Sequence, residues 1–417
     1  MALILYLLLI ALSFGGPVVE KKLSNGIKLI VKETEGKGIV SMVVFFRGGL
    51  NAEKIPGETH LLFTLLLKGS ENYPSSYEIS MPFEKYGGYI YSSSGNDFSE
   101  IGFSTKVEGL KEALSVIRDI LSRPLLREED INREKKNTVV AIRSKRERGM
   151  ELAMEHLRKL TYRGTPYENS PLGTEDSVVK ISRNDLLRRL SHLARGDNIV
   201  VAFAGDMRVQ EVIDLLEETF SDIPEGSIDV KPVNATIRET KVVRVKREGT
   251  QATILCAFNA PSYGSEDYFT FKVLASALGD GMTSKLFQEL REKRGYAYAT
   301  YAFYPTRLSA PRLFAYIGTS PSKKEDALRD MVRTVKDPSL EEKDIEIAKN
   351  KIVGDFLLDH QTRLRQAWYL GFYEVMGLGW RMDEEFPRRV RNVSLEQVNY
   401  ALKRYIDEYH CVVVEPE

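Results

Sequence analysis

The sequence contains few of the residues that bind metals or form disulfides, with five histidines and two cysteines in 417 residues. Lys+Arg and Asp+Glu both number 59, so no excess positive charge is present to attract nucleic acid or an anionic membrane. Cys256 and Cys411 are far apart and neither belongs to a CxxC pair, so we expect two small buried hydrophobic residues rather than a metal site or redox pair. The 43% hydrophobic and 28% charged residues are typical of a packed protein with two or more domains.

One long hydrophobic run is present, at the start of the chain. Ala2–Phe14 is almost wholly apolar and is followed by Gly15 and Gly16, small residues where a signal peptidase could cut. The run is too short to cross a bilayer as a helix, which takes about 20 residues. We therefore expect a signal peptide at residues 1–16 and an exported, periplasmic protein. The alternative is an uncleaved N-terminal anchor, although nothing later in the sequence predicts stable membrane insertion.

The chain contains an internal duplication. Eight identities occur in the 23 positions from Ala113 to Lys135 when these are compared with Ala327 to Lys349, at a constant offset of 214. The repeat predicts two lobes, residues 17–226 and 236–417, joined by a linker that contains Pro224, Gly226, Pro232 and Asn234.

Each lobe combines the strand and helix patterns. The β-rich runs Val40–Phe46 and Thr253–Phe258 are each followed by a helix-like stretch. Both lobes end with an amphipathic helix, Asn184–Leu193 or Leu395–Glu408, that leads into a β-branched strand. We therefore expect an α+β fold of two homologous lobes, each a mainly antiparallel sheet covered by helices.

Several motifs resemble those of the M16 metallopeptidases, the family of insulinase, pitrilysin and the mitochondrial processing peptidase. The matching segments are Gly57-Glu58-Thr59-His60, Lys68-Gly69-Ser70, Pro171-Leu172-Gly173-Thr174, Gly281-Met282-Thr283-Ser284-Lys285-Leu286-Phe287 and Arg291-Glu292-Lys293-Arg294-Gly295-Tyr296-Ala297-Tyr298. The chain length is similar to that of the M16B branch, whose members commonly work as pairs of subunits. The resemblance implies half of a chamber that encloses a peptide.

The resemblance also identifies a degenerate metal site. Active members carry HxxEH on a helix, and a distant glutamate completes the zinc ligands. The aligned segment keeps His60, but Phe63 replaces the catalytic base and Thr64 replaces the second histidine. The distant glutamate should fall at Val140-Ala141, where neither side chain can bind zinc. We therefore expect no metal and no cofactor in this chain.

The second lobe retains the other half of the family's site. M16 enzymes use an arginine and a tyrosine, seven residues apart, that close over the substrate, and Arg291 and Tyr298 match this pattern. A guanidinium presents forked donors to a peptide carbonyl, and a phenol can donate to the oxyanion that forms at the cleaved bond. We expect the arginine to lie on a helix over Thr283–Lys293 and the tyrosine to start a strand. By themselves, an arginine at a helix end and a tyrosine at a strand start are common surface residues.

The loss is therefore confined to the metal half of the site. This asymmetry predicts a non-catalytic subunit of a heteromeric metalloendopeptidase that supplies Arg291 and Tyr298 to an HxxEH-bearing M16B partner. The partner would hold the zinc, and an unfolded or extended peptide would be the substrate. Two alternatives remain: a scaffold similar to the cytochrome bc1 core proteins, or a module that binds peptides at a sheet edge. No GxxxxGK[ST] phosphate loop and no GxSxG elbow occurs.

Overall fold

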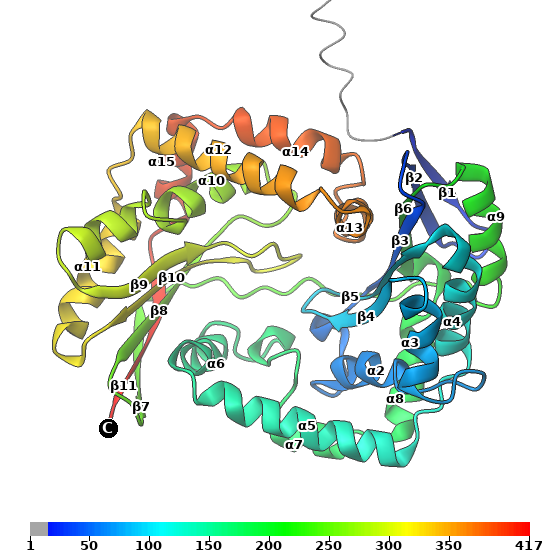
Figure 1. Cartoon of the computed structure of the whole chain (residues 1–417). Coiled ribbons are helices and arrows are strands. Elements are labelled where there is room, and N and C mark those ends of the chain that lie inside the picture. The colour runs from blue at the N-terminus through cyan, green and yellow to red at the C-terminus, as the bar shows by residue number, and fades with distance from the viewer. Residues whose placement is uncertain (1–15) are drawn as a thin grey trace, which may run out of the picture.

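The computed structural model describes residues 16–417 and shows two lobes, each built on one β-sheet (Figure 1). The predicted signal peptide at residues 1–16 lies outside the described residues, apart from Gly16. The strands of the first sheet are β1 (Val18–Lys22), β2 (Lys28–Glu33), β3 (Ile39–Arg47), β4 (Tyr89–Ser94), β5 (Phe98–Lys106) and β6 (Ile199–Gly205). Those of the second sheet are β7 (Lys241–Arg247), β8 (Ala252–Asn259), β9 (Ala297–Phe303), β10 (Arg312–Thr319) and β11 (Tyr409–Pro416).

Helices cover both sheets. The first lobe contains α2 (Glu58–Leu66), α3 (Ser76–Glu84), α4 (Leu110–Ser122), α5 (Glu128–Arg146), α6 (Gly149–Thr161), α7 (Glu175–Lys180), α8 (Arg183–Leu193) and α9 (Val209–Thr219). The second contains α10 (Tyr268–Gly279), the π-helical turn η5 (Phe287–Glu292), α11 (Lys324–Lys336), α12 (Glu342–Asp359), α13 (Arg363–Val375), α14 (Met382–Arg391) and α15 (Leu395–Tyr405). None of the helices in residues 16–417 is both long enough and apolar enough to span a membrane.

The two sheets have the same topology. The strand order β2-β6-β3-β5-β4 of the first lobe recurs as β7-β11-β8-β10-β9 in the second, and β1 adds one strand to an edge of the first sheet. In each lobe one pair is parallel, β2 with β6 and β7 with β11, and the other pairs are antiparallel. Helices α4 and α11 begin 214 residues apart, as do α6 and α13. The predicted α+β fold of two homologous lobes is therefore confirmed.

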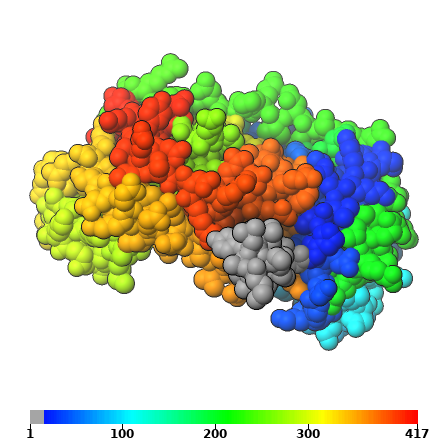
Figure 2. Space-filling model, turned by 90° about the horizontal axis from the view of Figure 1, so that it is seen from above, coloured from blue at the N-terminus to red at the C-terminus, as the bar shows by residue number. Residues whose placement is uncertain are grey.

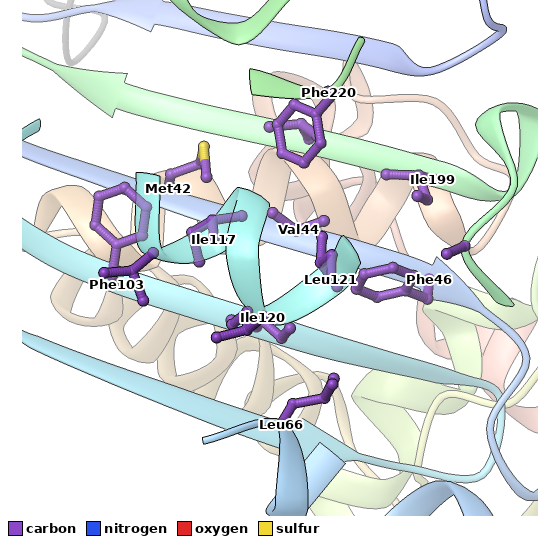
Figure 3. Close-up of a cluster of buried hydrophobic side chains, with 14 of the residues drawn as sticks. Met42, Val44, Phe46, Leu66, Phe103, Ile117, Ile120, Leu121, Ile199 and Phe220 are labelled. Atoms are coloured by element: carbon purple, nitrogen blue, oxygen red, sulfur yellow. The ribbon is translucent and has the colours of Figure 1, made fainter. Parts of the chain in front are cut away.

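The main core of the first lobe lies between its sheet and the helices of one face. Leu110, Leu114, Ile117 and Leu121 line the buried side of α4, as their helical spacing predicts. In Figure 3, Ile117 and Leu121 point toward Val44 on β3. Burial of each such side chain stabilises the folded protein by about 1.5–3 kcal/mol relative to leaving it exposed.

Each lobe covers the other lobe's sheet with one helix. Helix α6 of the first lobe packs on β8 and β11, while α13 of the second packs on β3 and β6. The second contact is close because α13 carries Gly371, where a Cβ would lie 2.2 Å from the Phe45 ring. The Trp380 indole, beyond α13, donates to Glu20 at 2.8 Å. Figure 2 shows the α13–α14 segment in orange against the blue N-terminal strands.

The cysteine prediction is partly wrong. Cys256 and Cys411 are fully buried in the second core, as expected, but they form a disulfide. They lie opposite each other on the antiparallel strands β8 and β11, with Cα atoms 4.1 Å apart. Their separation of 155 residues hid the pairing, since only the sheet register brings these strands together.

Candidate functional site

Helix α2 carries the degenerate motif and is fixed by two turns of the chain that touch. Gly57 precedes the helix at φ +91°, and a Cβ there would lie 2.6 Å from the Leu172 carbonyl oxygen. Gly173 returns the contact, since its Cβ would lie 2.3 Å from the Pro56 oxygen. Only glycine allows both the left-handed backbone and this approach. Two segments that the sequence analysis singled out, 57–60 and 171–174, therefore meet at the start of α2.

The three motif side chains on α2 have different surroundings. His60 is half-buried, and burial lowers the pKa of its imidazole. Phe63 is 2% exposed and packs edge-on against Phe46, with ring centroids 5.4 Å apart. The Thr64 hydroxyl donates to the His60 carbonyl oxygen at 2.9 Å, so it is occupied by its own helix. Of the three side chains, only the His60 imidazole could bind a metal, because Phe63 is a core ring and the Thr64 hydroxyl is hydrogen-bonded within its helix.

The position expected for the distant zinc ligand lies on α5, which packs on α2. Val140 is 64% exposed and Ala141 is also exposed, and neither can bind a metal. Within residues 16–417, no group of three His, Cys, Asp or Glu side chains could hold a metal ion. The residues present at this site therefore do not fit a catalytic zinc, which needs three protein ligands.

The charges beside His60 were not found from the sequence. After burial, the Lys145 ammonium contributes most to the lowered pKa of His60, while Glu134 acts in the opposite direction. Glu134 is 7% exposed and forms an ion pair with Lys68 at 3.2 Å, so its charge is already balanced. The positive field of Lys145 opposes a divalent cation. Both Lys145 and Glu134 lie on α5, and only the packing of α5 on α2 could have revealed them.

Arg291 lies on η5 and Tyr298 on β9 of the second lobe, whereas the degenerate motif lies on α2 of the first lobe; Figure 1 shows β9 and α2 in different lobes. Arg291 is exposed on η5, and its guanidinium stacks over the Phe287 ring at 5.0 Å from the centroid. Tyr298 is 57% exposed on β9, an edge strand. Among the described residues, no ion pair or hydrogen bond joins the two side chains to each other.

Local irregularities in the backbone present both side chains. The helix expected at Thr283–Lys293 is shorter and ends in the π-helical turn that carries Arg291. On β9, Ala297 pairs with Thr319 and Ala299 with Gly318, so Tyr298 is the extra residue of a β-bulge. Bulges and π-turns are frequent at functional sites because they re-aim a side chain. The sequence spacing of seven residues gave no sign of either.

The two lobes, the duplicated sheet topology and the incomplete metal site define a peptidase-like fold without a peptidase metal site. The family described as "Insulinase (Peptidase family M16)" matches residues 29–175, and "Peptidase M16 inactive domain" matches residues 180–352. The chain belongs to the M16 family, which confirms the resemblance stated above.

Relatives of this chain carry names of two kinds. The uncharacterized zinc protease YmxG of Bacillus subtilis is 23% identical over 402 residues, covering 94% of this chain and 97% of that protein. A non-peptidase homolog, also named YmxG, from Helicobacter pylori is 22% identical and covers 71% of this chain and 69% of that protein. The crystal structure of a peptidase M16 inactive domain from Pseudomonas fluorescens has a TM-score of 0.89 at 19% identity, covering 96% of this chain and 98% of its own.

Proposed function

We propose that this protein is the zinc-free subunit of a heteromeric peptidase of the M16B type. The observation that carries the proposal is the asymmetry between its lobes. The first lobe has Phe63 and Thr64 where a base and a ligand belong, while the second keeps Arg291 and Tyr298 on its surface. The partner subunit supplies the HxxEH motif and its zinc. The name "non-peptidase homolog" of the Helicobacter pylori relative supports a role without independent catalysis.

The chemistry of the exposed pair suits a peptide held between two subunits. The Tyr298 phenol projects from a bulge and can donate a hydrogen bond to the oxyanion of the cleaved carbonyl. Arg291, held over the Phe287 ring, can direct its forked donors to a peptide carbonyl. Both groups bind and orient the substrate, and the partner's residues carry out the proton transfers.

The sheet edges offer a way to hold an extended substrate. Strands β9 and β4 each terminate a sheet, so one side of each backbone is available for pairing. A peptide can add to such an edge as a further strand. This observation also favours the second candidate, a peptide-binding module that acts without any catalytic partner.

The disulfide supports the proposed export. Buried disulfides persist in oxidising compartments such as the bacterial periplasm. Cys256–Cys411 is fully buried between two core strands, which agrees with maturation after removal of the predicted signal peptide at residues 1–16.

The test is steady-state cleavage of an unstructured peptide by the pair reconstituted with its HxxEH-bearing partner. Tyr298→Phe should lower turnover by roughly 10- to 1000-fold, since one oxyanion donor is removed while the ring remains. Arg291→Lys should weaken peptide binding, because a lysine cannot form the planar fork. Subunit association, measured separately by sedimentation, should stay unchanged in both variants.

Matched controls are available in the same lobe. Tyr400 is 63% exposed on α15 and Arg388 is an exposed arginine on α14, and Tyr400→Phe and Arg388→Lys should match wild type. If Tyr298→Phe and Arg291→Lys also match wild type, the chain contributes nothing to the active site. It would then be a scaffold similar to the cytochrome bc1 core proteins. If the chain binds extended peptides but no partner, the peptide-binding module is the correct function.

A further inference from the structure

The second lobe contains a cavity that the proposed catalytic pair does not use. Its volume is about 740 Å³, and it lies among α10, α12 and α13, close to the junction between the lobes. Trp368 of α13 belongs to both, since it lines the cavity and its indole donates to Glu100 of β5 in the first lobe at 2.8 Å. An aromatic wall of this kind suits a large apolar or aromatic side chain. The rings that form it are Tyr268, Phe356, Trp368, Tyr369, Phe372, Tyr373 and Phe386.

One lysine faces this aromatic wall. The Lys272 ammonium donates to the Tyr304 carbonyl oxygen at 3.0 Å and lies 5.3 Å from the ring centroids of Tyr268 and Tyr304. Within residues 16–417 no carboxylate lies within ion-pair distance of Lys272. Burial lowers the pKa of the ammonium to about 8, so it is still mostly charged at neutral pH. One donated bond leaves further donor capacity on a charged group in an apolar wall.

The other charges around the cavity are already paired. Asp359 forms an ion pair with Arg365 and accepts a hydrogen bond from the Tyr369 hydroxyl at 2.8 Å. Asp355 lies 3.6 Å from the Lys351 ammonium. These two carboxylates leave Lys272 as the charged group of the cavity wall that lacks an ionic partner within the described part of the chain. An anionic group of a ligand would supply the ionic partner that Lys272 lacks among the described residues.

The cavity lies among helices whose counterparts in the first lobe surround the degenerate metal motif. Helices α10, α12 and α13 are the repeats of α2, α5 and α6. At the offset of 214, Asp355 is the counterpart of Ala141, the position expected for the distant zinc ligand. The cavity therefore lies among helices that the duplication relates to those around His60, with different side chains on them.

We propose that this cavity binds the C-terminal residue of a peptide, with the free α-carboxylate on the Lys272 ammonium and an aromatic or large aliphatic side chain between the cavity's rings. The proposal rests on the proposed function in so far as that function supplies peptides. An ammonium and a carboxylate form a charge-assisted hydrogen bond that is strong where water is excluded. Because Lys272 has no ionic partner among the described residues and only one of its N–H donors is used, a ligand with a carboxylate is favoured over one without it, which gives selectivity for a free terminus.

The experiment is titration calorimetry of the full chain with two pairs of probes. The first pair is N-acetyl-phenylalanine and its amide, and the second is a hexapeptide ending in phenylalanine with a free or an amidated terminus. Each acid should bind roughly 10-fold more tightly than its amide, or better. Lys272→Met, which keeps an unbranched side chain of nearly the same length but removes the ammonium, should abolish this preference. Lys336→Met is the matched control, because that lysine also lies over a tyrosine ring but on α11, away from the cavity.

The outcomes separate this inference from the proposed function. Equal binding of acid and amide, or an unchanged preference in Lys272→Met, overturns the inference. If both acids fail to bind at millimolar concentration, the inference is also overturned. A preference for the acids that depends on Lys272 supports it even if Arg291 and Tyr298 prove unimportant for cleavage. The only tryptophans of the sequence are Trp368 and Trp380, and Trp368 lines the cavity. If the ligand quenches the tryptophan fluorescence of wild type but not that of Trp368→Phe, the ligand lies at the cavity wall.

Discussion

The two lobes share one topology but differ in the side chains that their equivalent helices carry. In the first lobe, α2 and α5 bring a half-buried imidazole beside Lys145 and an already paired Glu134. In the second, α10 and α12 border an aromatic cavity with Lys272 in its wall. The order of helices and strands is the same in both lobes, whereas the side chains at these positions differ. The duplication thus preserves the helical framework, while the side chains on it differ between the lobes.

The cores of the lobes also differ in how their central strands are joined. The second sheet has a covalent link between β8 and β11 through Cys256 and Cys411. The corresponding strands of the first sheet, β3 and β6, pair through apolar residues such as Val44 and Val201. Substitutions that remove or restore these features in one lobe therefore test what each difference contributes to stability and activity.

The largest effect is expected when the metal motif is restored in the first lobe. Phe63→Glu with Thr64→His should lower the free energy of unfolding by roughly 5 kcal/mol, because a carboxylate replaces a fully packed ring. The double variant should gain no zinc-dependent cleavage, since position 141 remains alanine. Urea unfolding and a peptide-cleavage assay measure the two outcomes. Thr64→His alone is the control and should cost less than about 1 kcal/mol. Zinc-dependent cleavage by the double variant would show that another residue acts as the distant ligand.

The next largest effect concerns the disulfide of the second lobe. Cys256→Ala with Cys411→Ala should lower the free energy of unfolding by roughly 4 kcal/mol, because the link closes a long loop of the unfolded chain. Reduction of wild type should give a similar loss in denaturant unfolding. If oxidised wild type, reduced wild type and the double variant unfold at the same denaturant concentration, the disulfide does not contribute to the stability of this lobe.

Removal of the cavity lysine should stabilise the protein. The pKa of Lys272 falls from its ordinary 10.5 to about 8 because burial disfavours its charge. At pH 7 the ammonium is charged in the folded and the unfolded state, so the folded state carries the full cost of burying that charge. Lys272→Met should therefore raise the free energy of unfolding by about 3 kcal/mol. Between pH 8 and 10.5 the folded state releases this proton before the unfolded state does, so wild-type stability rises relative to the variant. The difference should vanish near pH 10.5, and Lys336→Met should show none at any pH. A stability loss in Lys272→Met at pH 7 contradicts the unpaired charge.

The smallest effect compares two helical glycines. Gly371→Ala should cost about 2 kcal/mol, since the added methyl meets the Phe45 ring where α13 packs on the first sheet. Gly354→Ala on α12 has open space around its Cβ and should gain up to about 1 kcal/mol from helix propensity. Equal effects of the two substitutions in thermal unfolding would mean that α13 can move away from the sheet.

Periodicity and the repeat were enough to predict the lobes, because the pattern of buried positions is local. The helix α4 and the strands β3 and β8 follow directly from the spacing of their apolar residues. The predicted end of the last helix, Glu408, was three residues too far, since α15 ends at Tyr405. Such ends depend on capping and on the strand that follows.

The features missed by sequence analysis all depend on contacts between distant segments. Lys145 beside His60 comes from the packing of two helices, and the disulfide comes from the register of two strands. The bulge at Tyr298 reflects a pairing shift that no residue type signals. The position of each candidate residue was predictable, whereas its surroundings required the fold.

The exchange of α6 and α13 has a consequence for the order of events during synthesis. The face of the first sheet that carries Phe45 and Ala202 is covered by α13, which begins only at Arg363. A nascent chain that has completed its first lobe therefore leaves this apolar face open until most of the second lobe has emerged from the ribosome. During that interval the face is exposed to chaperones and to other nascent chains, and the first lobe reaches its final state only when the second does.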